Sequence, residues 1–210
     1  MRTRLSFIPV LLFISILYPS WLPAQEGSDG RTHEKFFLRF LAGMGAGNIA
    51  LDFPESDMVF SAAGGLFHFQ IGREISKNLA LFVDMGGFSL SDPKLEWQGT
   101  STTLTDTSLN SNSWGIGLSY YIMPVNIYFA GSLMLARTKI KNQDQDLGES
   151  KLGPGIFLSI GKEWWIGKRW GLGITGFYEG AWLKDKEDAQ GYNASINNQI
   201  FGIAITATMF

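Results

Sequence analysis

The chain of 210 residues contains no cysteine, so it forms no disulfide and no thiolate metal site, and it lacks the cysteine that lipoproteins acylate. Histidine is almost as scarce. Only His33 and His68 are present, and neither belongs to a pattern typical of a metal site or of an activated nucleophile. The sequence therefore predicts no metal, no cofactor and no enzymatic activity.

The chain also lacks an apolar run long enough to cross a bilayer as a helix. Its N-terminal run, residues 7–18, has 12 residues, whereas a membrane-spanning helix needs about 20. Arg2 and Arg4 precede this run and the small-residue segment 22–24 follows it, which is the pattern of a secretory signal. We expect cleavage after Ala24, so that residues 1–24 are the signal peptide.

An excess of basic residues is absent as well. Without Arg2 and Arg4, the 17 basic residues become 15 against 19 acidic ones, a net charge of about −4. This balance predicts no nucleic-acid partner, because phosphates demand a basic face. The remaining length suits one domain, which we place at residues 36–210 after an N-terminal lead of residues 25–35.

What the chain does contain is alternation of apolar residues with polar residues or glycine, the period of a β-strand with two different faces. The alternation predicts eight strands, at 36–49, 59–73, 78–90, 113–122, 125–138, 152–164, 169–183 and 197–210. The links 50–58, 91–112, 139–151 and 184–196 are long and polar, whereas 74–77, 123–124 and 165–168 are short. Antiparallel transmembrane barrels have this asymmetry, with short turns at the periplasmic rim and long loops outside.

Parity along each strand predicts which side chains face lipid. In 113–122, Trp114, Ile116 and Leu118 point one way, and the intervening glycines and Ser119 point the other way. Glycines on the inner face suit a narrow barrel of about eight strands. We expect aromatic girdles at both rims: Phe36, Tyr120, Trp164, Trp165 and Trp170 at the inner rim, and Phe88, Trp114 and Trp182 at the outer rim.

Two other interpretations of the pattern remain open. The uncharged stretch 107–136 could be one or two transmembrane helices, but its apolar residues recur every two positions. A soluble periplasmic barrel or sandwich could bury the larger apolar face, but the small face would then make a poor solvent surface.

The last strand, residues 201–210, ends in Phe210. Together with the signal, the strand count and the alternating links, it resembles the OmpA-like and OmpX-like eight-stranded outer-membrane barrels over residues 36–210. The resemblance implies a monomer in contact with outer-membrane lipids, and a barrel-assembly machinery that recognises Phe210. However, Thr206 and Thr208 share the parity of Phe210, so either a bulge shifts the phase or Phe210 turns inward.

Parity also places a few polar side chains inside the barrel, namely Arg39, His68, Gln70, Asp84 and Glu179. Arg39, His68 and Asp84 lie at matching depths, about four to six residues from the periplasmic rim. Glu179 lies about ten residues in, roughly 10 Å higher, which makes it the poorer partner for Arg39. Since an unpaired charge in a poorly hydrated lumen is costly, we expect Arg39 to pair with Asp84.

The sequence thus predicts an all-β outer-membrane barrel with a structural or surface-interaction role. Adhesion or binding of an extracellular ligand would depend on loops 91–112 and 184–196. A small-solute channel is the alternative, although the resemblance favours a plugged lumen. A lipid-modifying enzyme that uses His68 is less favoured, because no serine and carboxylate of matching depth and parity stand out on the adjoining strands.

Overall fold

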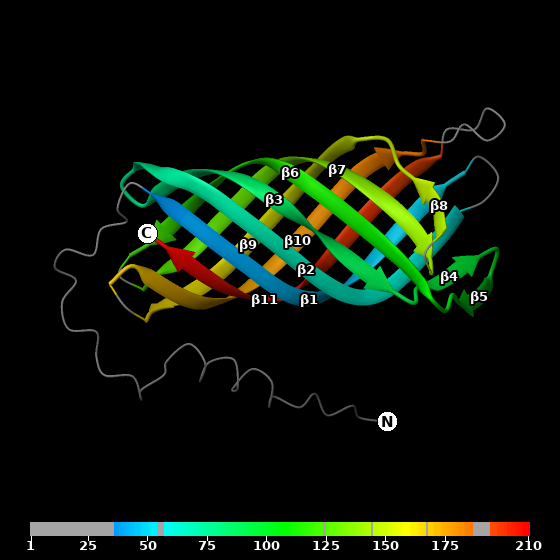
Figure 1. The fold of residues 1–210 in the computed structure, drawn as a ribbon, viewed down its shortest axis with the longest axis horizontal. Coiled ribbons are helices and arrows are strands. Elements are labelled where there is room, and N and C mark those ends of the chain that lie inside the picture. Colours follow the sequence, from blue (N-terminus) through cyan, green and yellow to red (C-terminus); the bar gives the residue numbers. More distant parts are fainter. Residues whose placement is uncertain (1–35, 54–56, 124, 144, 167, 187–193) are drawn as a thin grey trace, which may run out of the picture. The chain divides into compact units, whose positions relative to one another are not determined.

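The chain folds into a closed antiparallel β-barrel in this computed structural model (Figure 1). The structure describes residues 36–53, 57–123, 125–143, 145–166, 168–186 and 194–210. The predicted signal, its cleavage site and the N-terminal lead lie outside the described residues. No helix within these ranges is long and apolar enough to cross a membrane.

Eight long strands form the barrel wall. They are β1 (Phe37–Asp52), β2 (Asp57–Ser76), β3 (Leu79–Ser91), β6 (Thr107–Ile122), β7 (Ile127–Asn142), β9 (Gly153–Trp165), β10 (Trp170–Lys184) and β11 (Ser195–Met209). β1 pairs with both β2 and β11, which closes the ring. Because the ring is closed, the wall has no free sheet edge. The predicted fold class is confirmed.

Three short strands extend the barrel at one end. They are β4 (Lys94–Trp97), β5 (Thr100–Thr103) and β8 (Gln145–Glu149). β4 pairs with both β2 and β5, and β8 pairs with β7. Gln98 and Gly99, with φ of 48° and 75°, form the tight turn between β4 and β5. The C-terminus lies at the opposite end of the barrel (Figure 1).

The links after β3, β7 and β10 are longer than the turns after β2, β6 and β9, as predicted, but the strands extend further than predicted. β1 and β2 run to Asp52 and from Asp57, so the predicted long loop 50–58 is wrong. Residues 91–112 contain β4, β5 and the start of β6, and residues 139–151 contain β8. The strands continue beyond the apolar belt, where the outward face becomes polar while inward residues such as Leu51 and Leu109 stay apolar. The outward apolar series therefore ends in the sequence although the pairing continues.

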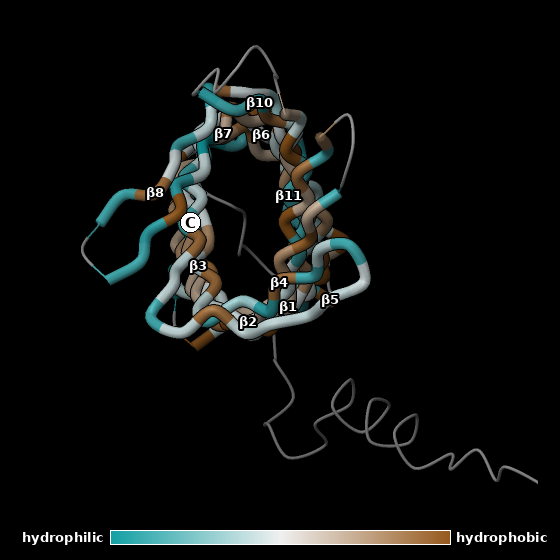
Figure 2. Tube along the Cα trace, turned by 90° about the vertical axis from the view of Figure 1, so that its right-hand side faces the viewer, coloured by the Kyte–Doolittle hydropathy of each residue, from teal (hydrophilic) through white to brown (hydrophobic). Residues whose placement is uncertain are grey.

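The outer surface of the wall is apolar. Leu133, Ile203 and Ile205 are 64–72% exposed. The residues next to each of them along its strand face inward, which confirms the predicted parity. Figure 2 shows that the polar segments gather at the β8 hairpin and near the end of β10. Two predicted girdle residues are wrong, because Phe88 is buried inside the barrel and Trp165 packs against the buried ring of Phe210. Phe88 lies four positions from Asp84 on β3, and Trp165 lies two positions from Glu163 on β9, so each shares the inward face of its strand.

The interior has three layers along the strands. An aromatic cluster at the short-turn end includes Phe37, Phe82 and Tyr121. A larger apolar cluster at the other end includes Leu66 and Phe88, and Leu95 of β4 packs against it. Buried polar side chains lie between the two clusters. The interior is therefore packed with side chains.

Candidate functional site: the polar layer of the lumen

The structure places all five predicted lumen residues on inward-facing positions of the wall. Arg39, His68, Gln70 and Asp84 are fully buried, and Glu179 is nearly so. They come from β1, β2, β3 and β10. The strand register brings Arg39 opposite Gln70, and Gln70 opposite Asp84. Strand pairing alone therefore places three of the five predicted residues side by side.

Arg39 pairs with a carboxylate that the sequence prediction missed. Its Nε lies 3.5 Å from Oε1 of Glu163 on β9, and both side chains are fully buried. The expected partner Asp84 is wrong as a direct contact, since Gln70 lies between the two side chains. Glu163 shares the inward parity of Gly161, and this was the signal that could have identified it.

The guanidinium of Arg39 is enclosed by neutral groups as well. It donates to Thr208 Oγ1 at 3.2 Å, to Ser119 Oγ at 3.3 Å and to the hydroxyl of Tyr121. Its Cζ also lies 3.7 Å from the centre of the Tyr128 ring. Such a set of acceptors and ring faces is what a buried guanidinium needs to offset its lost hydration.

His68 lies between two carboxylates. Its Nδ1 is 2.8 Å from Asp84 Oδ1, and its Nε2 is 3.1 Å from Glu179 Oε2. The ring stacks on Phe157, with the centroids 4.0 Å apart. The imidazolium form satisfies this arrangement, because it donates from both ring nitrogens. The predicted poor fit of Glu179 to Arg39 agrees with these contacts, since Glu179 instead serves His68.

Gln70 joins the two halves into one network. Its Oε1 accepts from Arg39 Nη1 at 3.2 Å, and its Nε2 donates to Asp84 Oδ2 at 3.0 Å. Serine hydroxyl groups also donate to the two carboxylates, Ser132 to Asp84 at 2.6 Å and Ser113 to Glu179 at 3.1 Å. The polar layer therefore crosses the lumen as a continuous set of hydrogen bonds.

Inward glycines give the large side chains their space. A Cβ at Gly86 would lie 2.5 Å from Cγ of His68, and one at Gly117 would lie 2.6 Å from the Phe82 ring. Both approaches are closer than a side-chain carbon tolerates. Glycine at these positions is thus a packing requirement of the filled lumen.

The layer does contain serines and carboxylates close to His68, contrary to the sequence-based expectation. However, Ser113 and Ser132 donate to carboxylates, and both nitrogens of His68 face carboxylates. The side chain of His68 has no exposed surface. Within the described residues, no group of histidine, aspartate and glutamate side chains is arranged to hold a metal ion. The arrangement suits cross-linking of the wall.

Comparison of the sequence finds no matching family model and no significantly similar curated protein. The fold, in contrast, matches solved structures. Neisserial surface protein A (NspA) has a TM-score of 0.50 at 15% identity, covering 81% of this chain and 96% of that chain. OprG of Pseudomonas aeruginosa has a TM-score of 0.52 at 10% identity, and the match covers 86% of this chain and 99% of OprG. The outer-membrane protein AlkL has a TM-score of 0.50 at 12% identity, and the match covers 89% of this chain and 93% of AlkL. The chain has the fold of eight-stranded outer-membrane β-barrels.

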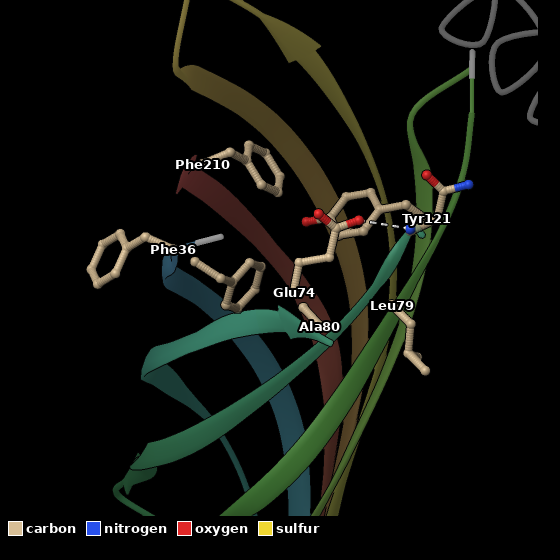
Figure 3. Close-up of a pocket in the computed structure, with 8 residues that line it drawn as sticks. Phe36, Glu74, Leu79, Ala80, Tyr121 and Phe210 are labelled. Atoms are coloured by element: carbon tan, nitrogen blue, oxygen red, sulfur yellow. Dashed lines mark hydrogen bonds between the residues drawn. The ribbon is translucent and has the colours of Figure 1, made fainter. Parts of the chain in front are cut away.

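In this outer-membrane barrel fold, Phe210 turns inward at the short-turn end. The register of β1 with β11 runs unbroken from Leu38 opposite Met209, so the second alternative for the final strand holds. The ring of Phe210 lies 5.4 Å from that of Tyr121 and 5.3 Å from that of Trp165. Figure 3 shows Phe210 and Tyr121 lining a pocket with Glu74, whose carboxylate accepts from the backbone N–H of residue 78 at 2.9 Å.

Proposed function

We propose that the protein is a bacterial outer-membrane barrel with a structural and surface-interaction role, exerted through its long links at the cell surface. The observation that carries the proposal is the packed lumen. An aromatic cluster, a cross-linked polar layer and an apolar cluster succeed one another along the strands. A filled interior directs any interaction with another molecule to the outside of the barrel.

Membrane insertion is supported by the apolar belt. Large apolar side chains such as Leu133, Ile205 and Phe201 are exposed around the wall, and a soluble protein rarely exposes so extensive an apolar surface. Outer-membrane lipids would cover this belt. Export would follow cleavage near Ala24, and Phe210 would serve the barrel-assembly machinery as a terminal signal. The closed ring needs no second copy, which favours a monomer.

The surface role is supported by the outer end of the barrel. The β4–β5 hairpin lies within the predicted interaction loop 91–112 and exposes Trp97, which is 43% exposed next to the turn. Exposed aromatic side chains are common anchors of interfaces. In the second predicted loop, 184–196, residues 187–193 lie outside the described part. The name of NspA describes a surface protein, which agrees with this proposal.

The test compares adhesion and conductance. Cells that express the protein are applied to cultured epithelial monolayers, and residues 94–103 are replaced by a short glycine-serine link. The control variant carries glycine and serine at residues 77–78, in the turn at the other end. The proposal predicts that only the first exchange lowers adhesion. Purified protein in a planar bilayer should give no stepwise conductance, and regular ion steps from the wild type would favour the channel instead.

A further inference from the structure

The outward face of β7 changes abruptly from apolar to basic. Leu133 and Leu135 are exposed within the apolar belt, and the next residues of the same parity are Arg137, Lys139 and Lys141. We call these three the basic row. Their side chains are 38–44% exposed. Residues of one face follow each other at about 6.6 Å along a strand, so the row begins directly beyond the belt.

A single carboxylate holds part of this row together with a cation that follows the end of β10. Glu149 Oε1 lies 3.1 Å from Arg137 Nη1 and 3.3 Å from Lys139 Nζ, and its Oε2 lies 2.7 Å from Lys186 Nζ. The backbone N–H of Lys186 donates to the carbonyl of Glu149, which fixes the segment after β10 beside the end of β8. Three cations share one carboxylate, so the group has a surplus of positive charge.

Hydrogen bonding to Lys186 and the neighbouring cations lower the pKa of Glu149 to about 2. The carboxylate is therefore ionised at neutral pH and still leaves the cations in excess. Lys141, by contrast, has a carboxylate of its own, 3.4 Å away on Asp146. The surplus is thus concentrated on Arg137, Lys139 and Lys186, next to the apolar belt.

The opposite side of the same end has the opposite charge. Asp52 of β1 and Asp57 of β2 face each other in register, and Asp52 accepts from Asn197 at 3.0 Å. The basic group is therefore a local feature of β7 and of the segment that follows β10. A general attraction between the whole rim and anionic lipid would not require such a one-sided distribution.

We propose that the basic row and Lys186 bind the phosphate of a lipid headgroup whose acyl chains lie against Leu133 and Leu135. This inference rests on the proposed position of the barrel in the outer membrane. A guanidinium with ammonium groups beside it matches the charge and the acceptor oxygens of a phosphate. The apolar belt below the row holds the acyl chains, so that one lipid satisfies both surfaces.

The test uses the folded mature protein in vesicles that contain equal amounts of phosphatidic acid and diacylglycerol with the same acyl chains. The two lipids differ only in the phosphate. Native mass spectrometry after detergent extraction gives the ratio of the two lipids retained. We expect the wild type to retain phosphatidic acid preferentially, and the triple variant R137Q/K139Q/K186Q to lower the ratio at least tenfold. The estimate follows from about fivefold per basic side chain near a membrane surface.

Two controls identify the cause. The variant R137K/K139R/K186R keeps the charge and should keep the ratio. The variant K77Q/K162Q/K168Q removes three cations at the short-turn end and should change the ratio less than about threefold. An equal loss in K77Q/K162Q/K168Q, or no preference in the wild type, would overturn the proposal. So would displacement of the bound lipid by an equal concentration of inorganic phosphate, because a lipid-specific site also binds the chains.

Each variant is first checked for a heat-dependent shift in gel mobility. A wild type without this shift would contradict the proposed membrane barrel itself, and not only the lipid site. If the triple variant alone fails to fold, the single variant K139Q tests the lipid site instead. The Lys139 side chain is exposed and makes no contact in the buried interior, so K139Q should fold. K139Q should lower the lipid ratio about fivefold, and an unchanged ratio would overturn the proposal.

Discussion

Replacing Glu163 by glutamine tests the partner of Arg39 inside the lumen. The substitution keeps the size of the side chain but removes the carboxylate 3.5 Å from Arg39 Nε, where both side chains are fully buried. Breaking a buried ion pair by neutralising one partner costs about 3–5 kcal/mol. Arg39 retains its hydrogen bonds to Thr208, Ser119 and Gln70, so we expect the lower end, about 3 kcal/mol.

The double variant R39M/E163Q should recover part of this loss. Methionine fills the space of the aliphatic stem of Arg39 without a charge, so neither buried ion remains. We expect a coupling energy between the two positions of about 2 kcal/mol. The cycle between Arg39 and Asp84 should give less than about 1 kcal/mol, because Gln70 stands between them.

Urea unfolding in lipid vesicles, followed by tryptophan fluorescence, gives the free energies. E96Q serves as the control, since it breaks the Lys94–Glu96 pair, in which both side chains are more than half exposed. Such a surface pair contributes about 0–1 kcal/mol. If E163Q costs no more than E96Q, or if the effects at Arg39 and Glu163 simply add, the assignment of this buried pair is wrong.

Three further predictions follow from named contacts. Gly86→Ala should destabilise the folded barrel because its methyl group would meet His68, whereas Gly176→Ala, whose nearest neighbour would be 3.9 Å away, should be nearly neutral in the same urea assay. Because the folded-state pKa of Glu149 is lowered to about 2, its contribution to the β7–β8 hairpin should be complete above about pH 4.5 and lost as the pH falls towards 2. Protease nicking of this hairpin should rise over that window, and Glu149→Gln should abolish the dependence. Protease added to intact cells should cut within residues 94–103 and spare the short turns, and the reverse pattern would invert the topology.

Strand periodicity predicts the facing of most side chains, although Phe88 and Trp165, predicted for the aromatic girdles, face inward. Arg39, His68 and Asp84 were assigned to the lumen because residues two apart share a face, and all three are buried there. The orientation of Phe210 also followed from parity, once its register with β1 was known. Whether a side chain points inward or outward depends on its position along its own strand, so it can be predicted from one sequence.

Partners across the lumen could not be predicted in the same way. Depth counted along each strand suggested Asp84 for Arg39, but tilt and stagger shift the strands of a barrel relative to one another. The result brings Glu163 of β9 to Arg39, and Glu179 of β10 to His68. Such contacts depend on the shear of the whole ring, which no local pattern encodes.

The alternation pattern could not predict where the strands end either. Residues 107–112 pair with β7 in unbroken register, yet Leu109 is their only apolar side chain, and the outward Ser108, Asn110 and Asn112 are polar. Above the apolar belt, water meets the outer face of the wall, so no alternation is required there. The sequence therefore marks where the belt ends, and the paired strands continue beyond it.

The most direct test of the membrane barrel is gel mobility of the protein in outer-membrane fractions, with and without boiling in SDS. A closed wall without free edges should resist SDS at room temperature, so the unheated protein should migrate at a different position from the boiled one. Recovery in the soluble periplasmic fraction, with the same mobility before and after boiling, would contradict the account.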